Sequence, residues 1–126
     1  MTTVKKTTIE DILRVKDIIE EKKNIPFYSQ TFDSEIEIEY IPADKFVEIV
    51  NSLHETPPLR GDCEIIYACC PIFRNKELQE AFDIDDPIDI VEKAFGNNVF
   101  EIDNLAKHIM KRYGYYDNAV ENIKKQ

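Results

Sequence analysis

The sequence predicts a mainly α protein of the α+β class, a bundle of short helices with one β-hairpin in its N-terminal half. Two observations predict this class. Apolar residues recur at helical spacing along most of the chain. Within residues 35–41, three glutamates instead alternate with Ile36, Ile38 and Tyr40, which is typical of a strand with one buried face. The 126 residues fit one domain spanning 1–126, because no linker, repeat or low-complexity tract divides them.

The first predicted element is a helix over residues 8–23. Thr7 and Thr8 precede Glu10 and Asp11 at the spacing of a capping box, in which threonine caps the helix and a carboxylate bonds back to the backbone. Two lysines near the end of the segment suit the negative end of the helix dipole. The apolar stripe consists of Ile9, Ile12, Leu13 and Ile19, with Val15 and Ile18 beside it.

A hairpin is predicted over residues 27–41. Its second strand places isoleucine and tyrosine side chains on one face and three glutamates on the other. Residues 27–32 carry a weaker strand pattern, and the pair Asp33-Ser34 supplies the turn between the two strands. Pro42 ends the second strand because proline has no amide hydrogen to donate.

Residues 43–124 are predicted to form a run of short helices. Asn75 and Asp86 are predicted N-caps, and Gly96 and Gly114 stand where helices end. Prolines separate the other helices, because proline restricts the residue before it and lacks an amide hydrogen. The apolar stripes are Phe46, Ile49, Val50 and Leu53; Leu59, Cys63, Ile66 and Cys70 over 58–70; Leu78, Ala81 and Phe82; Val91, Ala94 and Phe95; Ile102, Leu105, Ala106, Ile109, Met110 and Tyr113; and Val120 and Ile123 over 117–124.

The charge of the chain excludes several classes of partner. Asp and Glu number 25 against 16 Lys and Arg, which gives a formal charge of −9. A field of this sign repels phosphate, so we expect neither nucleic acid nor membrane among the partners. No apolar run approaches the roughly 20 residues that a membrane span needs, and no apolar stretch follows Met1 as in a signal peptide. We therefore expect a cytoplasmic protein.

The three cysteines allow two interpretations, zinc ligation or burial in the core. His54, Cys63, Cys69 and Cys70 contain no Cys-x-x-Cys pair, and their spacing does not match the usual structural zinc sites. Cys63 and Cys70 lie on the apolar stripe of the helix predicted over 58–70, and cysteine is among the residues most often buried. We interpret all three as buried thiols and expect no bound metal.

The sequence offers little support for catalysis. A cysteine nucleophile would need His54 or His108 as its base, and nothing in the sequence places either histidine beside a thiol. A calcium loop would need alternating oxygen ligands and a glycine, and a predicted helix start interrupts the acidic run. The run consists of Asp83, Asp85, Asp86 and Asp89. Three glycines cannot build a phosphate-binding loop, so we expect no enzymatic activity and no cofactor.

Aromatic residues are the candidate functional residues. Most aromatic side chains pack in a core, but a small helical domain seldom buries all of them. Exposed aromatic side chains are enriched at protein interfaces. The candidate protein-binding residues are Phe27, Tyr28, Phe32, Phe95, Phe100, Tyr113, Tyr115 and Tyr116.

The C-terminal two-thirds of the chain resembles a known family. The likeness is carried by residues 71–82, 87–91, 99–105, 113–115 and 123–125. Their order is a leucine-bearing short helix, a proline-led helix, a segment with a glutamate, and a glycine-aromatic turn before a final short helix. In this order the chain resembles the XkdN-like tail assembly chaperones of phages and phage-tail-like particles.

The resemblance implies a function without catalysis. Such chaperones bind the long helical tape measure protein transiently, cover its apolar stretches, and help to bring tail tube subunits to it. The chain is then expected in the cytoplasm of the host cell and not in the mature particle, with self-association possible. The alternative is a small acidic adaptor or regulatory protein that binds one folded partner.

The resemblance also implies a second, longer product. In many tail chaperone genes a ribosomal slip near the stop codon fuses the short protein to an extension. Lys124 and Lys125 can be encoded by a run of adenines on which such a slip occurs, and the extended form would recruit the tail tube protein. The simpler interpretation is that both lysines complement the negative end of the last helix.

Overall fold

The computed structural model describes residues 5–21 and 26–114. Within these residues it contains six α-helices, one 3₁₀ helix and one two-stranded antiparallel hairpin, so the predicted mainly α class with a hairpin in the N-terminal half is confirmed. The elements are α1 (Ile9–Glu21), β1 (Phe27–Ser29), β2 (Ser34–Ile36), α2 (Ala43–Ser52), α3 (Pro58–Cys69), η1 (Pro71–Arg74), α4 (Lys76–Ala81), α5 (Asp89–Ala94) and α6 (Val99–Arg112).

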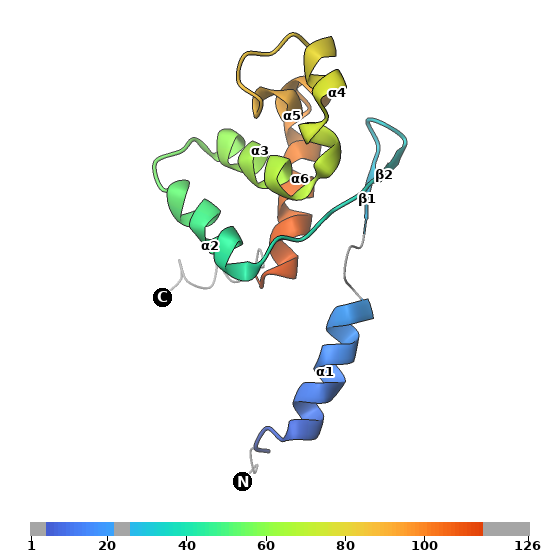
Figure 1. Ribbon diagram of the computed structural model, residues 1–126, viewed down its shortest axis with the longest axis vertical. Helices are drawn as coiled ribbons and strands as arrows, with labels where there is room; N and C mark the ends of the chain where they lie inside the picture. The colour runs from blue at the N-terminus through green and yellow to red at the C-terminus, as the bar shows by residue number, and fades with distance from the viewer. Residues whose placement is uncertain (1–4, 22–25, 115–126) are drawn as a thin grey trace.

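The first helix, α1, begins with the predicted capping box. The Asp11 amide donates to Thr8 Oγ1 at 3.2 Å, and the Thr8 amide donates back to Asp11 Oδ2 at 3.0 Å. Lys5 and Arg14 both contact the same Asp11 carboxylate. Figure 1 shows α1 as a separate rod that projects from the rest of the molecule. The local sequence therefore accounts for where α1 begins.

The hairpin is shorter than predicted. Phe27 pairs with Ile36 and Ser29 with Ser34, so the paired strands are β1 and β2 rather than the whole of 27–41. Continuing this register would place Pro26 opposite Glu37, and proline has no amide hydrogen for the ladder. The missing donor gives a physical reason for the early end of the pairing.

The alternation of burial nevertheless continues beyond the paired strands. Ile36 and Ile38 are buried and Tyr40 is half-buried, whereas the two intervening glutamates, Glu37 and Glu39, are exposed. In place of a strand partner, the Glu39 amide donates to the Cys69 carbonyl at 2.7 Å. The extended segment is thus attached to the end of α3.

The core lies between α3 and α6. In Figure 1 α6 runs the height of the body, α3 crosses it, and α4 and α5 lie toward one end. Ile102, Leu105 and Ile109 of α6 are fully buried, as the apolar stripe predicts. The buried face of α3 is wider than predicted, since Gly61, Ile65 and Cys69 join its stripe. The buried residues of α3 are Gly61, Cys63, Ile65, Ile66 and Cys69.

Short helices cover one end of this core. Asn75 caps α4 as predicted, accepting a bond from the Leu78 amide at 3.0 Å. The N-cap predicted at Asp86 is two residues early. Asp86 Oδ1 accepts from the Ile88 amide at 3.1 Å in a turn, whereas the N-cap of α5 is Ile88 and the helix begins at Asp89. Gly96 ends this segment at φ 61°, a left-handed conformation that suits glycine.

The 3₁₀ helix η1 was not predicted. It follows directly after α3, where Pro71 cannot continue the ladder of the α-helix. Arg74 Nη1 donates to the Tyr67 and Ala68 carbonyls at 2.7 and 2.8 Å. The guanidinium thus satisfies carbonyls near the end of α3 that have no helical partner.

The predicted helix over 117–124 lies outside the described residues, as do Tyr115, Tyr116 and the terminal lysines. Gly114, at φ 88°, follows α6 as predicted. Of the helices in the described part of the chain, none has the length and apolar character needed to cross a membrane.

Candidate functional site

The structure separates the candidate zinc ligands. His54 is exposed in the loop after α2, whereas Cys63, Cys69 and Cys70 are buried as free thiols. Burial raises the pKa of Cys63 to about 12 and that of Cys70 to about 12, so both remain protonated at neutral pH. Among the residues that the structure describes, no group of three or more His, Cys, Asp or Glu could hold a metal ion.

The acidic run has a structural role. Arg60 of α3 forms ion pairs with both Asp86 and Asp89, and its Nη1 lies 2.7 Å from Asp89 Oδ1. The bond from the Ile88 amide, followed by the bond from Arg60, lowers the pKa of Asp86. These carboxylates join the loop before α5 to α3.

Two of the candidate aromatic residues are structural. Phe95 is buried beneath the hairpin, 5.0 Å between ring centroids from Phe32, and so does not belong to an exposed surface. The half-buried Tyr113 stacks on Phe46 with 3.8 Å between centroids, and its hydroxyl donates to the Ile41 carbonyl at 2.7 Å. Apolar stripes on α5 and α6 explain both placements.

Three other candidates meet in a cleft between β1 and α6. Phe27, Tyr28 and Phe100 line it, together with Lys107 and Lys111, and its volume is about 540 Å³. The Phe100 side chain is 86% exposed. The lining also includes glutamine, asparagine and histidine side chains, so this cleft is mostly polar.

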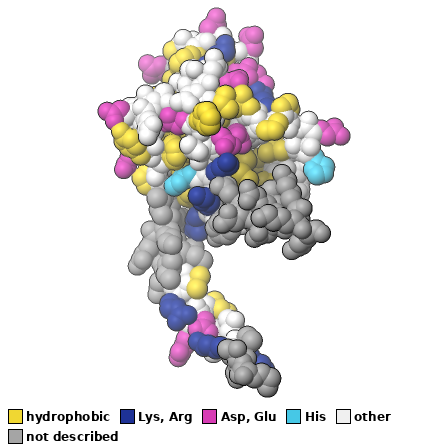
Figure 2. All heavy atoms as spheres, turned by 180° about the vertical axis from the view of Figure 1, so that it is seen from behind, with side chains coloured by type: hydrophobic (Ala, Val, Ile, Leu, Met, Phe, Trp, Pro, Cys, Tyr) yellow, Lys and Arg dark blue, Asp and Glu magenta, His cyan; other side chains and the backbone are white. Residues whose placement is uncertain are grey.

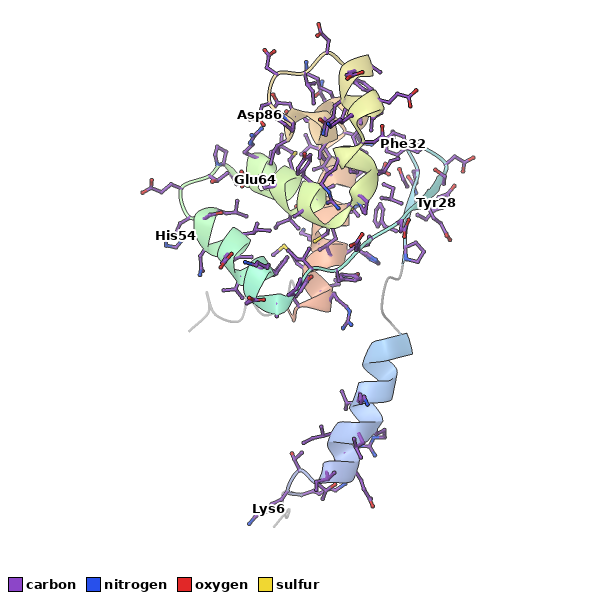
Figure 3. The ribbon with its side chains drawn as sticks, viewed as in Figure 1. Lys6, Tyr28, Phe32, His54, Glu64 and Asp86 are labelled. Atoms are coloured by element: carbon purple, nitrogen blue, oxygen red, sulfur yellow. The ribbon has the colours of Figure 1, made fainter. Side chains whose placement is uncertain are left out.

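The remaining candidate, Phe32, belongs to an apolar groove of about 490 Å³ on another side of the hairpin. The groove runs between β2 on one side and η1 and α4 on the other. We call it the hairpin groove, and its apolar lining residues are Phe32, Ile36, Ile72, Phe73, Leu78, Phe82 and Ala94. Figure 3 shows Phe32 on the part of the hairpin near α4, with Tyr28 further along it.

The hairpin groove presents apolar side chains to solvent. Phe32 and Phe82 are each 40% exposed and Ile72 is 53% exposed, whereas Phe73 beneath them is buried. Glu35 and Glu37 line the same groove from β2 and the residue after it. The hairpin groove is thus an apolar surface with the carboxylates of Glu35 and Glu37 along one wall. Figure 2 shows acidic side chains spread over the body with hydrophobic side chains between them.

A buried carboxylate holds the hairpin wall in place. Glu101 of α6 accepts bonds from the Ser29 hydroxyl and from the Thr31 amide, the latter at 3.1 Å. Ser29 Oγ in turn accepts from the Phe32 amide at 3.2 Å. Burial opposes ionisation of Glu101, but the bonds from Ser29 and Thr31 outweigh it and lower the pKa of this carboxyl. The turn that carries Phe32 is therefore anchored to α6.

Sequence reasoning did not predict this groove. Leu78 and Phe82 belong to the apolar stripe predicted for a short helix, but Phe82, which directly follows α4, is exposed because this six-residue helix covers little of the core. Ile72 and Phe73 lie in the unpredicted η1. The partner of Glu101 lies 70 residues away in sequence, and no local pattern indicates such a pair.

Comparison of the chain with protein-family models, with curated proteins and with solved structures finds no match.

Proposed function

We propose that this protein is a tail assembly chaperone of a phage or phage-tail-like particle, and that the hairpin groove binds apolar stretches of the tape measure protein. The observation that carries the proposal is the groove itself, an open trough with Phe32, Ile72 and Phe82 exposed on its walls. Grooves of this kind receive the apolar face of an amphipathic helix, with apolar anchors three and four residues apart.

The sequence resemblance supports the same surface. The likeness to the chaperone family begins at residues 71–82, which include η1 and α4, and these two elements line one wall of the groove. The acidic residues Glu35 and Glu37 favour a client segment with lysine or arginine beside its apolar stripe. We expect a transient complex, because the groove would contact only one face of a client helix.

In this proposal the protein acts in the host cytoplasm and leaves before the particle is complete. The short form covers the client, and a frameshift-extended form brings tail tube subunits. Tethering both activities to one client raises their effective concentration near each other. The gene is then expected between the genes for a tail tube protein and for a very long helical protein.

Co-expression with that long helical protein, followed by pull-down, tests the proposal. We expect the unchanged chain to retain the long protein and the Phe82→Asp variant to lose it, because a carboxylate in the groove opposes apolar contact. Val47→Asp on α2 is the matched control, since Val47 is also exposed and lies outside the groove lining.

Retention of the long protein by both variants would contradict the groove as the client site. Failure of the unchanged chain to retain it at all would contradict the chaperone function. Capture of one folded protein in place of the long helical one would favour the alternative of an acidic adaptor.

A further inference from the structure

The first helix exposes an apolar face that the rest of the described chain does not cover. Ile9, Ile12 and Leu13 are 76%, 61% and 54% exposed. The helix has 13 residues, and isolated helices of about this length are marginal in water. The capping box fixes where α1 begins, but most helical stability in proteins comes from packing of an apolar face. A partner for this face would therefore stabilise α1.

The hairpin groove has the complementary properties. Ile9, Ile12 and Leu13 stand at positions i, i+3 and i+4 of α1, the spacing with which a helix fills an apolar groove. Lys16, exposed, stands at i+7 on the same face. The exposed face of α1 thus carries a cation beside its apolar residues, and the hairpin groove is bordered by Glu35 and Glu37. Both apolar contact and charge favour this pairing.

We propose that α1 of a second copy of this chain lies in the hairpin groove, and that the two copies exchange their first helices reciprocally. The inference rests on the proposed function, because it concerns the same groove. The exchanged helix covers the groove until a client helix displaces it, so the dimer is the resting form and the client-bound chain is the active form.

A second copy explains the observed position of α1 better than the chain's own groove does. α1 projects away from the body (Figure 1), and its apolar face is open to solvent rather than turned to its own groove. A projecting arm reaches a neighbouring molecule without rearrangement. Reciprocal exchange between two copies closes on itself, which limits the assembly to a dimer and avoids a chain of open ends.

Analytical ultracentrifugation of the full chain over a wide range of concentration tests the inference. We expect the unchanged protein to pass from one chain to two as its concentration rises. The double variant Ile12→Asp, Leu13→Asp changes only the arm, and Phe82→Asp changes only the groove. Each should sediment as one chain where the unchanged protein sediments as two. Glu10→Gln, at an exposed position off the apolar stripe of α1, should dimerise normally.

Mixing the arm variant with the groove variant provides the decisive measurement. Each mixed pair has one intact arm and one intact groove, so a mixed dimer should form although neither variant dimerises alone. Lys16→Glu should weaken the dimer, and combining it with Glu35→Lys and Glu37→Lys should restore it. Circular dichroism checks that every variant retains the fold.

Several results would overturn the inference without affecting the proposed function. If the unchanged protein sediments as a monomer at every concentration, the copies do not exchange α1. A dimer that survives Phe82→Asp but not the arm variant pairs α1 with something other than the groove. A single chain that binds its client more tightly once the arm is changed places α1 in its own groove. In each of these cases the pull-down still decides whether the groove binds the long helical protein.

Discussion

At the scale of single residues, two carboxyl groups that are buried or half-buried, Glu101 and Asp62, have shifted pKa values. Glu101 joins the hairpin to α6, and its pKa is lowered by bonds from Ser29 and Thr31 that outweigh burial. Asp62 of α3 has the opposite behaviour: burial and then the neighbouring Asp103 raise its pKa to about 7. Two carboxyl groups on neighbouring helices therefore respond to pH in opposite directions.

Replacing Glu101 with Gln should destabilise the protein by about 1–3 kcal/mol at neutral pH, because hydrogen bonds to a buried carboxylate are lost or weakened. A lowered pKa contributes stability above the unfolded value, near 4.5, that is lost as pH falls through the folded value. Urea unfolding at pH 7 and at pH 3 measures both effects. Glu80→Gln, at an exposed position on α4, should change neither.

Replacing Asp62 with Asn should remove a pH dependence in a different range. The folded state holds a proton on Asp62 up to about pH 7, whereas the unfolded chain releases it near pH 4, so stability falls as pH rises between these values. The variant should melt at a higher temperature than the unchanged protein at pH 8, and the difference should shrink toward pH 4. Equal melting curves at pH 8 would show that Asp62 is not perturbed. Asp85→Asn is the exposed control.

At the scale of elements, the apolar stripes decide which helices form the core. The stripe of α6 is the longest, and Ile102, Leu105, Ala106 and Ile109 are fully buried. The shorter α4 has no buried residue, although its sequence shows an apolar pattern. The difference is one of length and position, because a six-residue helix at the end of the body can turn only part of its surface inward.

Ile109→Ala should lower stability by about 2–5 kcal/mol, because it deletes a fully buried side chain and leaves a cavity. Thermal melting and urea unfolding measure the loss. Val99→Ala on the same helix is a matched control, since Val99 is 52% exposed and its truncation should change stability by less than about 0.5 kcal/mol. An unchanged melting temperature for Ile109→Ala would mean that this face of α6 is not packed.

At the scale of the whole molecule, one cluster of buried side chains joins the extended segment after the hairpin, α2, α3, α5, η1 and α6. The three thiols lie inside this cluster. Their accessibility to a reagent therefore reports on the packing of the entire body, and not on a local site.

Cys63, Cys69 and Cys70 should react slowly with a thiol reagent in the native protein and rapidly in urea. Burial and a raised pKa both reduce the fraction of reactive thiolate. The time course of the colour change measures the rates, and metal analysis of the same sample should find no stoichiometric zinc. Fast reaction in the native state would contradict the burial of these residues.

The sequence by itself determined the class of the fold, the helix caps at Thr8 and Asn75, the inward face of α6, and part of the inward faces of α3 and α5. These features depend on residues at most a few positions apart, so the spacing of apolar and capping residues along the sequence predicts them. Within the candidate set, the sequence also indicated Phe32, Tyr28 and Phe100, which are exposed.

Only the tertiary structure decided which of these residues act together. The hairpin groove combines Phe32 and Ile36 with Ile72 and Phe82, and the anchor of its wall joins Glu101 to Ser29 and Thr31 across about 70 residues. Such contacts depend on how the hairpin docks on α6. The spacing of apolar residues along the sequence does not predict this docking. The tertiary arrangement also left Phe82 exposed although it belongs to an apolar pattern, because the burial of a residue depends on the neighbours that its element finds as well as on that pattern.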